Sequence, residues 1–454
     1  MILTDRLENG MRVIAEPMQG VRSAAIGVWI AAGPVYELEN EAGISHMIEH
    51  MLFKGTERRT AGQIAAEMDG LGGNLNAFTA KECTCYYAKV LDEHLPKAVD
   101  ILQDLVQNPK LDPEDLAREQ GVVCEEILMM EDSPEELVHE LLGRAVYGQS
   151  PLSKPILGTQ ESVRAFGRDD LHAYMQRRYQ PQSMVVACAG HFEMPALMDM
   201  LNQAFRRAEG KNLTAAAGAD MPGMDMPGMD MPGTDIPGGE TSGMEVSGME
   251  MLPSALAEGR SFTGADKDVE QAHLCLGFPG FATDTAEQFA LLVMNNALGG
   301  SMSSRLFQRI REEKGLAYSV YSYPTGYSKT GYFALYAGTG EKQGPEVAQL
   351  MLEEVRAMRE RGMTEAEFTR AKEQLKGSYM LGQESSSARS GAIGRSMLLL
   401  GSAREEEDIL RRIEAVRMED VEAILPRVLD ESRMAAALVA RKGAKKALRK
   451  ALGM

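Results

Sequence analysis

The sequence contains no run of about 20 apolar residues, the length at which an α-helix can cross a membrane. Its first residues, Met1 to Arg6, also lack the basic stretch and the following apolar stretch of a secretory signal. We therefore expect a cytoplasmic protein with no membrane partner.

Positive charge is scarce. The 48 Lys and Arg residues stand against 66 Asp and Glu residues, which gives a formal net charge of −18. Such an acidic surface repels the phosphates of nucleic acids and of anionic lipids, so neither is an expected partner. The excess of acid suits basic or unfolded peptides, although solubility alone explains it as well.

Cysteine is also scarce. The five cysteines are odd in number and scattered along the chain, so we expect no disulfide framework. Cys83 and Cys85 have a spacing that resembles a metal-binding pair. Because alternation along a strand places both on one face, we interpret them as small buried residues.

The sequence has only seven histidines, and two of them lie one helical turn apart. In a helix, His46 and His50 share a face and can reach one tetrahedral Zn²⁺. Glu49 points near that face, where a carboxylate can accept a proton from a zinc-bound water. The order His-x-x-Glu-His is the inverted zinc-peptidase motif, and Ser45 is a candidate N-cap. A core helix with hydrogen-bonded histidines is the alternative.

Two imidazoles leave a zinc site incomplete, and a long helix predicted from Pro113 to about Glu131 offers carboxylates. Glu119 and Glu126 lie two turns apart on one face of it. We predict Glu126 as the third metal ligand and Glu119 as a group that orients a ligand or the water. The alternative is a solvated acidic face. The other histidines are expected near loops or element ends and suit the site poorly: His94, His139, His172, His191 and His273.

Residues 211–253 are dominated by Gly, Pro, Met and Asp. Met-Pro-Gly-Met-Asp at 221–225 recurs at 226–230 and, with one change, at 231–235. Such a repeat cannot bury enough apolar surface to fold, so we interpret it as a linker. A methionine-rich site for a soft metal or a partner is the alternative. The predicted domains are therefore 1–210 and 255–454, with the linker at 211–254.

The second half repeats the order of the first. Apolar patterns and helix start and stop residues predict strands at 23–32, 74–90, 183–190 and 268–277, and helices at 60–71, 95–107, 168–179, 195–207, 285–298 and 347–359. The helix start at Asp112 resembles a second one at Thr364, and in that register Ala371 replaces Glu119 and Ser378 replaces Glu126. The chain is therefore predicted to be a duplicated domain with one metal-bearing copy and one inert copy.

Residues 41–56, which contain the motif, closely resemble the active-site helix of the pitrilysin (insulinase-like) zinc peptidases, a family that includes the mitochondrial processing peptidase and bacterial relatives. The resemblance covers most of the chain outside the linker. Residues 119–126 are similar to the family's third-ligand helix, and the ligand there maps onto Glu126. Residues 73–79 are similar to its substrate-binding edge strand, which implies five substrate-binding residues: Asn74, Asn76, Ala77, Phe78 and Thr79.

In the second half, Arg311 and Tyr318 match the family's Arg and Tyr pair, which contacts substrate and helps to stabilise the oxyanion. The resemblance implies an α+β fold with two homologous domains, each a mainly antiparallel sheet with helices on one side. It also implies that two such chains pair into a hollow shell, in which this pair faces the zinc of the partner. Both motifs lie in one chain, which favours a homodimer, and a heterodimer stays open.

These observations predict a zinc-dependent endopeptidase that cleaves peptides or unfolded segments in an enclosed chamber. His46, His50 and Glu126 would bind the Zn²⁺, and Glu49 would be the catalytic base. A non-catalytic subunit that holds peptides or assembles a processing-peptidase-like complex is the main alternative, against which the intact motif argues. A maturation peptidase with one specific substrate is the second alternative.

Overall fold

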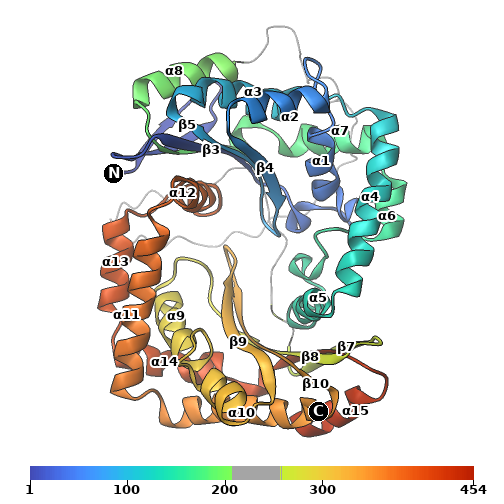
Figure 1. The fold of residues 1–454 in the computed structure, drawn as a ribbon, viewed down its shortest axis with the longest axis vertical. Helices are drawn as coiled ribbons and strands as arrows, with labels where there is room; N and C mark the ends of the chain where they lie inside the picture. Colours follow the sequence, from blue (N-terminus) through green and yellow to red (C-terminus); the bar gives the residue numbers. More distant parts are fainter. Residues whose placement is uncertain (207–255, 257) are drawn as a thin grey trace, which may run out of the picture.

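The computed structural model describes residues 1–206, 256 and 258–454. The predicted linker at 211–254, and with it the alternative of a methionine-rich site, lies outside these residues. The described residues form two halves, each built on its own β-sheet (Figure 1). The upper half in that view comes from the N-terminal part of the chain and the lower half from the C-terminal part.

The first sheet has six strands in the order β1-β2-β6-β3-β5-β4. All neighbouring strands are antiparallel except the parallel pair β2 and β6. Strand β4 forms one edge of the sheet, so one of its sides has no strand partner among the described residues. The strands are β1 (Leu3–Arg6), β2 (Arg12–Pro17), β3 (Ser23–Ile30), β4 (Asn74–Thr79), β5 (Thr84–Leu91) and β6 (Met184–Gly190).

The second sheet has five strands in the order β7-β11-β8-β10-β9. It repeats the topology of β2-β6-β3-β5-β4, because β7 and β11 are parallel and its other neighbouring pairs are antiparallel. Both sheets are thus mainly antiparallel, as predicted, and β9 is the counterpart of β4. The strands are β7 (Ser261–Asp266), β8 (Gln271–Pro279), β9 (Ala317–Gly326), β10 (Gly331–Gly340) and β11 (Ala435–Ala440).

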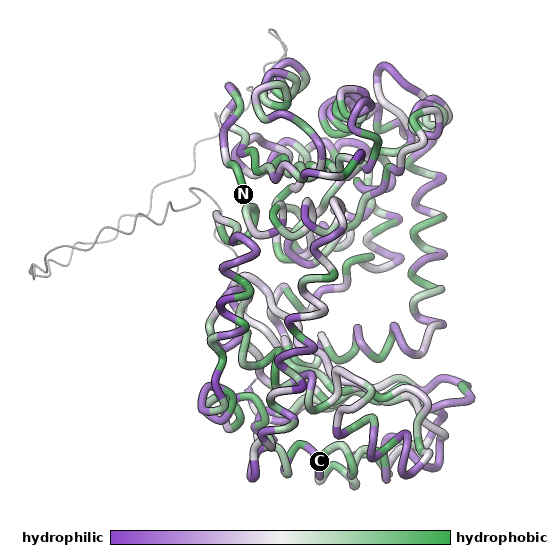
Figure 2. Tube along the Cα trace, turned by 60° about the vertical axis from the view of Figure 1, so that its left-hand side comes forward, coloured by the Kyte–Doolittle hydropathy of each residue, from purple (hydrophilic) through white to green (hydrophobic). Residues whose placement is uncertain are grey.

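The helices follow the same order in both halves. The first half contains α1 (Ile44–Leu52), α2 (Ala61–Gly70), α3 (Leu95–Gln107), α4 (Pro113–Asp132), α5 (Pro134–Tyr147), α6 (Gln160–Ala165), α7 (Arg168–Arg178) and α8 (Met194–Ala204). The second contains α9 (Ala286–Leu298), α10 (Gly344–Arg361), α11 (Glu365–Gly382), α12 (Ser386–Leu400), α13 (Glu406–Ala415), α14 (Met418–Val428) and α15 (Ala444–Leu452), with a π-helical segment, η6 (Phe307–Glu313), after α9. Hydrophilic and hydrophobic residues alternate along the long helices, as expected for helices buried on one face (Figure 2).

Helices α4 and α11 are counterparts, as the sequence comparison predicts. Asp112 and Thr364 cap them, and each side chain accepts a hydrogen bond from a backbone N–H in the first turn. Ala371 is buried in the core of the second half, while Ser378 is exposed. The second half therefore has no carboxylate at the positions of Glu119 and Glu126.

The two halves exchange one helix each. Helix α5 packs on the second sheet, where Val138 and Leu142 lie in one cluster with Tyr336. Its counterpart α12 packs on β2, β3 and β6 of the first sheet, where Ile393 and Met397 are buried among residues of those strands. Figure 1 shows both helices between the sheets. The expectation of helices on one side of each sheet is therefore incomplete, because each sheet also carries a helix of the other half on its second face.

A glycine fixes the closest approach of α12 to the first sheet. A Cβ added at Gly394 would lie 2.2 Å from Nε1 of Trp29 and 2.7 Å from Cβ of Ala187. We expect Gly394→Ala to lower the free energy of unfolding by about 1–3 kcal/mol, because a well-packed contact would be overfilled. The control is Gly391→Ala on the same helix, where nothing lies within 4 Å of the added Cβ. It should be neutral or stabilising by up to about 1 kcal/mol, and equal denaturation midpoints for both variants would contradict the prediction.

All five cysteines are free and buried, which confirms the predicted absence of a disulfide framework. Cys83 and Cys85 belong to the apolar cluster beneath α12. Within the described ranges, no helix has the length and apolar character needed to cross a membrane.

Candidate metal centre

Helix α1 buries one side in the core and is capped by a distant carboxylate. The N–H groups of Gly43 and Ser45 donate to the two oxygens of Glu37, at 2.9 and 3.1 Å. The predicted N-cap, Ser45, is wrong, because Ser45 lies within the helix and its hydroxyl pairs with the Tyr174 hydroxyl at 2.7 Å. Burial raises the pKa of Glu37 to about 7, and the hydrogen bonds from Gly43 and Ser45 act in the opposite direction.

The helix presents His46 and His50 together, with ring centroids 4.7 Å apart. Glu126, on the adjacent helix α4, completes the group. Its Oε2 lies 3.7 Å from Nε2 of His46 and 3.4 Å from Nε2 of His50. The ligand atoms of all three residues lie within 4.8 Å of one another. The structure thus brings together the three residues that the sequence analysis predicts as metal ligands.

The geometry of this group fits a zinc ion. In a tetrahedral site, ligand atoms about 2.0–2.1 Å from the zinc lie about 3.3–3.4 Å from one another. The distances of 3.7 and 3.4 Å from Oε2 of Glu126 to the two Nε2 atoms are close to this separation. Burial and the neighbouring His50 lower the pKa of His46 to about 4, so its imidazole is neutral and has a free lone pair. The group is also the only cluster of its kind among the residues that the structure describes.

Glu119 lies one layer behind the metal group. Its Oε2 is 3.0 Å from Nδ1 of His50, and its Oε1 is 2.6 Å from Nζ of Lys54. A carboxylate at Nδ1 favours the tautomer with the proton on that nitrogen, which leaves the lone pair on Nε2, the atom 3.4 Å from Oε2 of Glu126. Glu119 therefore lies where a group that orients a ligand must lie, and Lys54 holds it there.

We expect Glu119→Gln to weaken zinc binding about 10- to 100-fold, because the amide is a poorer acceptor for His50 and loses the ion pair with Lys54. Zinc affinity is measured by competition with a chelator of known affinity. Glu131→Gln, an exposed position on the last turn of α4, is the control. Equal zinc affinities for the two variants would show that Glu119 does not support His50.

Glu49 is a residue of α1, and its side chain reaches β4 near His50 and Glu126. Its Oε2 accepts a hydrogen bond of 2.6 Å from the hydroxyl of Thr79, the last residue of β4. Burial raises the pKa of Glu49, whereas the bond from Thr79 and the nearby His50 act in the opposite direction. A carboxylate in such surroundings is suited to accept and return a proton.

In the part of the chain that the structure describes, the edge strand β4 pairs only with β5, from Asn74 opposite Lys89 to Thr79 opposite Thr84. Exposure alternates along it, and its exposed residues are Asn74, Asn76 and Phe78. Phe78 is 39% exposed and makes an edge-to-face contact with Trp29. Of the five predicted substrate-binding residues, Ala77 and Thr79 are partly buried, and Thr79 instead contacts Glu49.

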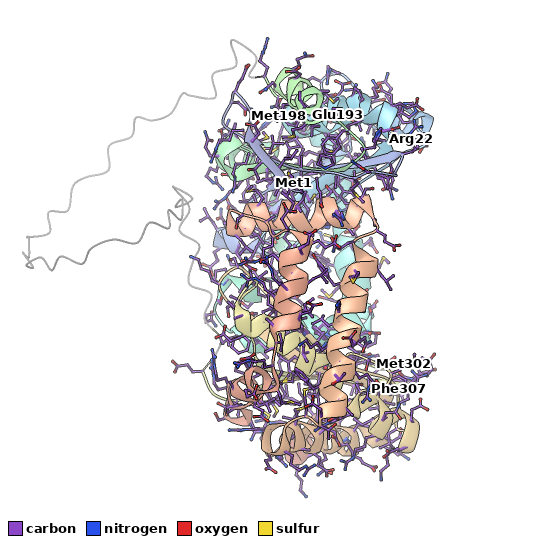
Figure 3. The ribbon with its side chains drawn as sticks, turned by 90° about the vertical axis from the view of Figure 1, so that its left-hand side faces the viewer. Met1, Arg22, Glu193, Met198, Met302 and Phe307 are labelled. Atoms are coloured by element: carbon purple, nitrogen blue, oxygen red, sulfur yellow. The ribbon has the colours of Figure 1, made fainter. Side chains whose placement is uncertain are left out.

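Arg311 lies on η6 and Tyr318 at the start of β9, both in the second half. Figure 3 labels Phe307, where η6 begins. The guanidinium of Arg311 stacks 4.7 Å from the ring centroids of both Phe307 and Tyr318. Tyr318 is 76% exposed. Within the described part of the chain, no hydrogen bond, ion pair or ring contact joins this pair to His46, His50 or Glu126.

Three histidines do not lie where the sequence analysis placed them. His139 lies inside α5, His172 inside α7 and His273 within β8, rather than near loops or element ends. The nitrogens of His139 lie 3.2 Å from the hydroxyl of Tyr321 and 2.7 Å from that of Tyr323, and His273 Nδ1 lies 2.9 Å from that of Tyr336. The contacts of His139 join α5 to the second sheet, and the contact of His273 joins β8 to β10 within that sheet. These two histidines are therefore structural residues outside the metal group.

The fold and the site define a duplicated α+β protein with one candidate metal centre. Residues 12–160 match the family model of the insulinase peptidases, family M16, and residues 165–375 match that of the M16 inactive domain. The chain is 39% identical to the uncharacterized zinc protease YmxG of Bacillus subtilis, over 95% of this chain and 96% of that protein. It therefore belongs to the M16 (insulinase) peptidase family.

Further relatives agree with this membership. An uncharacterized zinc protease of Streptomyces coelicolor is 38% identical, over 93% of this chain and 86% of that protein. Among solved structures, a protease from Helicobacter pylori has a TM-score of 0.81 at 20% identity, with 97% of this chain and 99% of that chain covered. An M16 inactive-domain protein from Pseudomonas fluorescens has a TM-score of 0.81 at 19% identity, with coverage of 98% and 99%. These two structures support the fold alone.

Proposed function

We propose that the chain is a zinc-dependent endopeptidase that cleaves peptides or unfolded protein segments. The observation that carries this proposal is the convergence of His46, His50 and Glu126 on one point, with the carboxylate of Glu49 beside it. Relatives that bear the name zinc protease support the same chemistry.

His46, His50 and Glu126 would hold the ion. A zinc ion bound there supplies an acidic water, whose pKa falls to about 7 in sites of this type. Glu49 would accept the proton of the attacking water at its free oxygen and pass it to the leaving amine. The positions of Glu119 and Lys54 would keep His50 oriented through both transfers.

The substrate would bind as an added strand along the free edge of β4. Backbone hydrogen bonds would give affinity for many sequences, as in other cases of strand addition. The residues proposed to contact the substrate are Asn74, Asn76, Ala77, Phe78 and Thr79, of which Thr79 would do so through its backbone because its side chain binds Glu49. The acidic net charge of −18 suits basic or unfolded peptides, although solubility alone explains it as well. We further propose that the substrate is cleaved in an enclosed chamber and that the enzyme is cytoplasmic.

Arg311 and Tyr318 would support the negative charge that develops on the carbonyl oxygen. Because they make no contact with the metal group of their own chain, we propose that each pair serves a second copy in a homodimer that forms a shell. A heterodimer with another subunit is the alternative. In this scheme, the metal-bearing domain comprises residues 1–210, the linker residues 211–254 and the inert domain residues 255–454.

A peptide-library digest with and without a chelator, read by mass spectrometry, tests the proposal. Cleavage at many sites that stops with chelator and returns with added zinc is the expected result. Zinc binding without any cleavage would favour the peptide-holding subunit instead. Cleavage of very few sequences would favour a specific maturation peptidase.

A further inference from the structure

A hydroxyl on the proposed substrate strand holds the proposed catalytic base. Thr79 Oγ1 donates to Glu49 Oε2 at 2.6 Å. Within the described residues, the Glu49 side chain accepts no other hydrogen bond. The side chain of Glu49 has three rotatable bonds and α1 fixes only its backbone, so the position of the carboxylate depends on Thr79.

We propose that Thr79 is a positioning residue that fixes the Glu49 carboxylate, with one oxygen bound and the other free to receive the proton. This inference rests on the proposed function and extends it. A threonine hydroxyl has a single hydrogen, and the short bond to Oε2 uses it. Oε1 is then the oxygen left for proton transfer, and its direction is set by the end of β4.

Thr79 is itself held in place by the neighbouring strand β5. Thr84 lies opposite Thr79 on β5, with their hydroxyl oxygens 3.3 Å apart. Thr84 is fully buried, and its hydroxyl lies 3.4 Å from the carbonyl oxygen of Ala32. Since β5 is flanked by strands on both sides, it gives Thr79 a rigid neighbour. A base held by such a group keeps its geometry through each turnover.

The arrangement also links binding to chemistry. A peptide that pairs with β4 is placed by the same strand that holds Glu49 through Thr79. The distance between the scissile bond and the base is then set within one strand and not across two independent elements. Loss of the Thr79 hydroxyl should therefore reduce the rate of the chemical step and leave peptide binding intact.

Three variants of the full chain test this inference. Thr79→Val keeps the shape of the side chain and removes the hydroxyl, whereas Thr79→Ser keeps the hydroxyl. Thr325→Val is the matched control, because it makes the same change on β9, the counterpart of β4. We expect Thr79→Val to lower kcat about 10- to 100-fold with KM within about twofold, since small errors in placement cost that much. Thr79→Ser should recover most of kcat, and all three should keep wild-type zinc content.

A crystal structure of Thr79→Val beside the wild type gives a readout that needs no activity. The expected result is a Glu49 side chain that leaves its wild-type rotamer in the variant. The inference is overturned if Glu49 keeps its rotamer in Thr79→Val, if that variant raises KM instead of lowering kcat, or if Thr79→Ser does not restore kcat. A wild-type protein without zinc-dependent cleavage would instead overturn the proposed function, and the rotamer of Glu49 would still decide the role of Thr79.

Discussion

Glu49→Gln is expected to lower kcat by about 100- to 10,000-fold, the usual contribution of a general base, while zinc binding stays unchanged. Glutamine has the shape of glutamate, and its amide oxygen can still accept the hydrogen bond from Thr79. It cannot accept a proton at neutral pH. The fold and the three metal ligands are left intact, so only proton transfer is removed.

The measurement pairs kcat on a cleaved peptide with zinc content by atomic absorption. Glu39→Gln is the control, because Glu39 is an exposed acid in the segment before α1. It should behave as the wild type in both measurements. If Glu49→Gln cleaves peptides as fast as the wild type, another group accepts the proton. If it loses its zinc, the variant does not isolate the base.

The central part of this site follows from local rules. Helical periodicity alone places His46, Glu49 and His50 near one face. The start signal at Asp112 sets the phase of α4, which puts Glu119 and Glu126 on one face of that helix. The structure bears this out, since both approach His50. Such predictions succeed because they concern residues a few positions apart in one regular element.

Helix caps show where local rules stop. Thr60, Asp112 and Thr364 are caps whose side chains accept a backbone N–H within their own first turn, so a local pattern finds them. Helix α1 is capped by Glu37, which reaches it only because the intervening loop folds back. Ser45 has the right residue type, but the left-handed Gly43 starts the helix before it.

Long-range packing is the second feature that local sequence patterns do not predict. Apolar periodicity tells which face of a strand or helix is buried but not what covers it. The sequence shows that β3 is apolar on both faces, yet the covering element α12 comes from the other half. The predicted elements do not include α5, although Ser133 and Pro134 repeat the start signal of α4. The bond between Thr79 and Glu49 was missed for the same reason, because it joins two elements 30 residues apart.

Glu126→Gln is expected to weaken zinc binding by more than about 100-fold. Loss of a residue that only orients a ligand lowers zinc affinity by about 10- to 100-fold, and loss of a direct ligand lowers it further. The amide that replaces the carboxylate has no negative charge, so the divalent ion is left with two neutral imidazoles. We expect cleavage to be lost at limiting zinc and partly restored at high zinc.

The adjacent residue on α4 offers the matched control for this prediction. Glu125 is exposed, whereas Glu126 faces His46 and His50, so the same change one position away should leave zinc binding unchanged. Thermal unfolding gives an independent measure, because an ion that binds only the native state stabilises it by about 4 kcal/mol at 1,000 times its Kd. Added zinc should therefore raise the Tm of the wild type and of Glu125→Gln but not that of Glu126→Gln. If Glu126→Gln keeps the full zinc-dependent rise in Tm, the third ligand lies elsewhere and α4 only shields the two histidines from solvent.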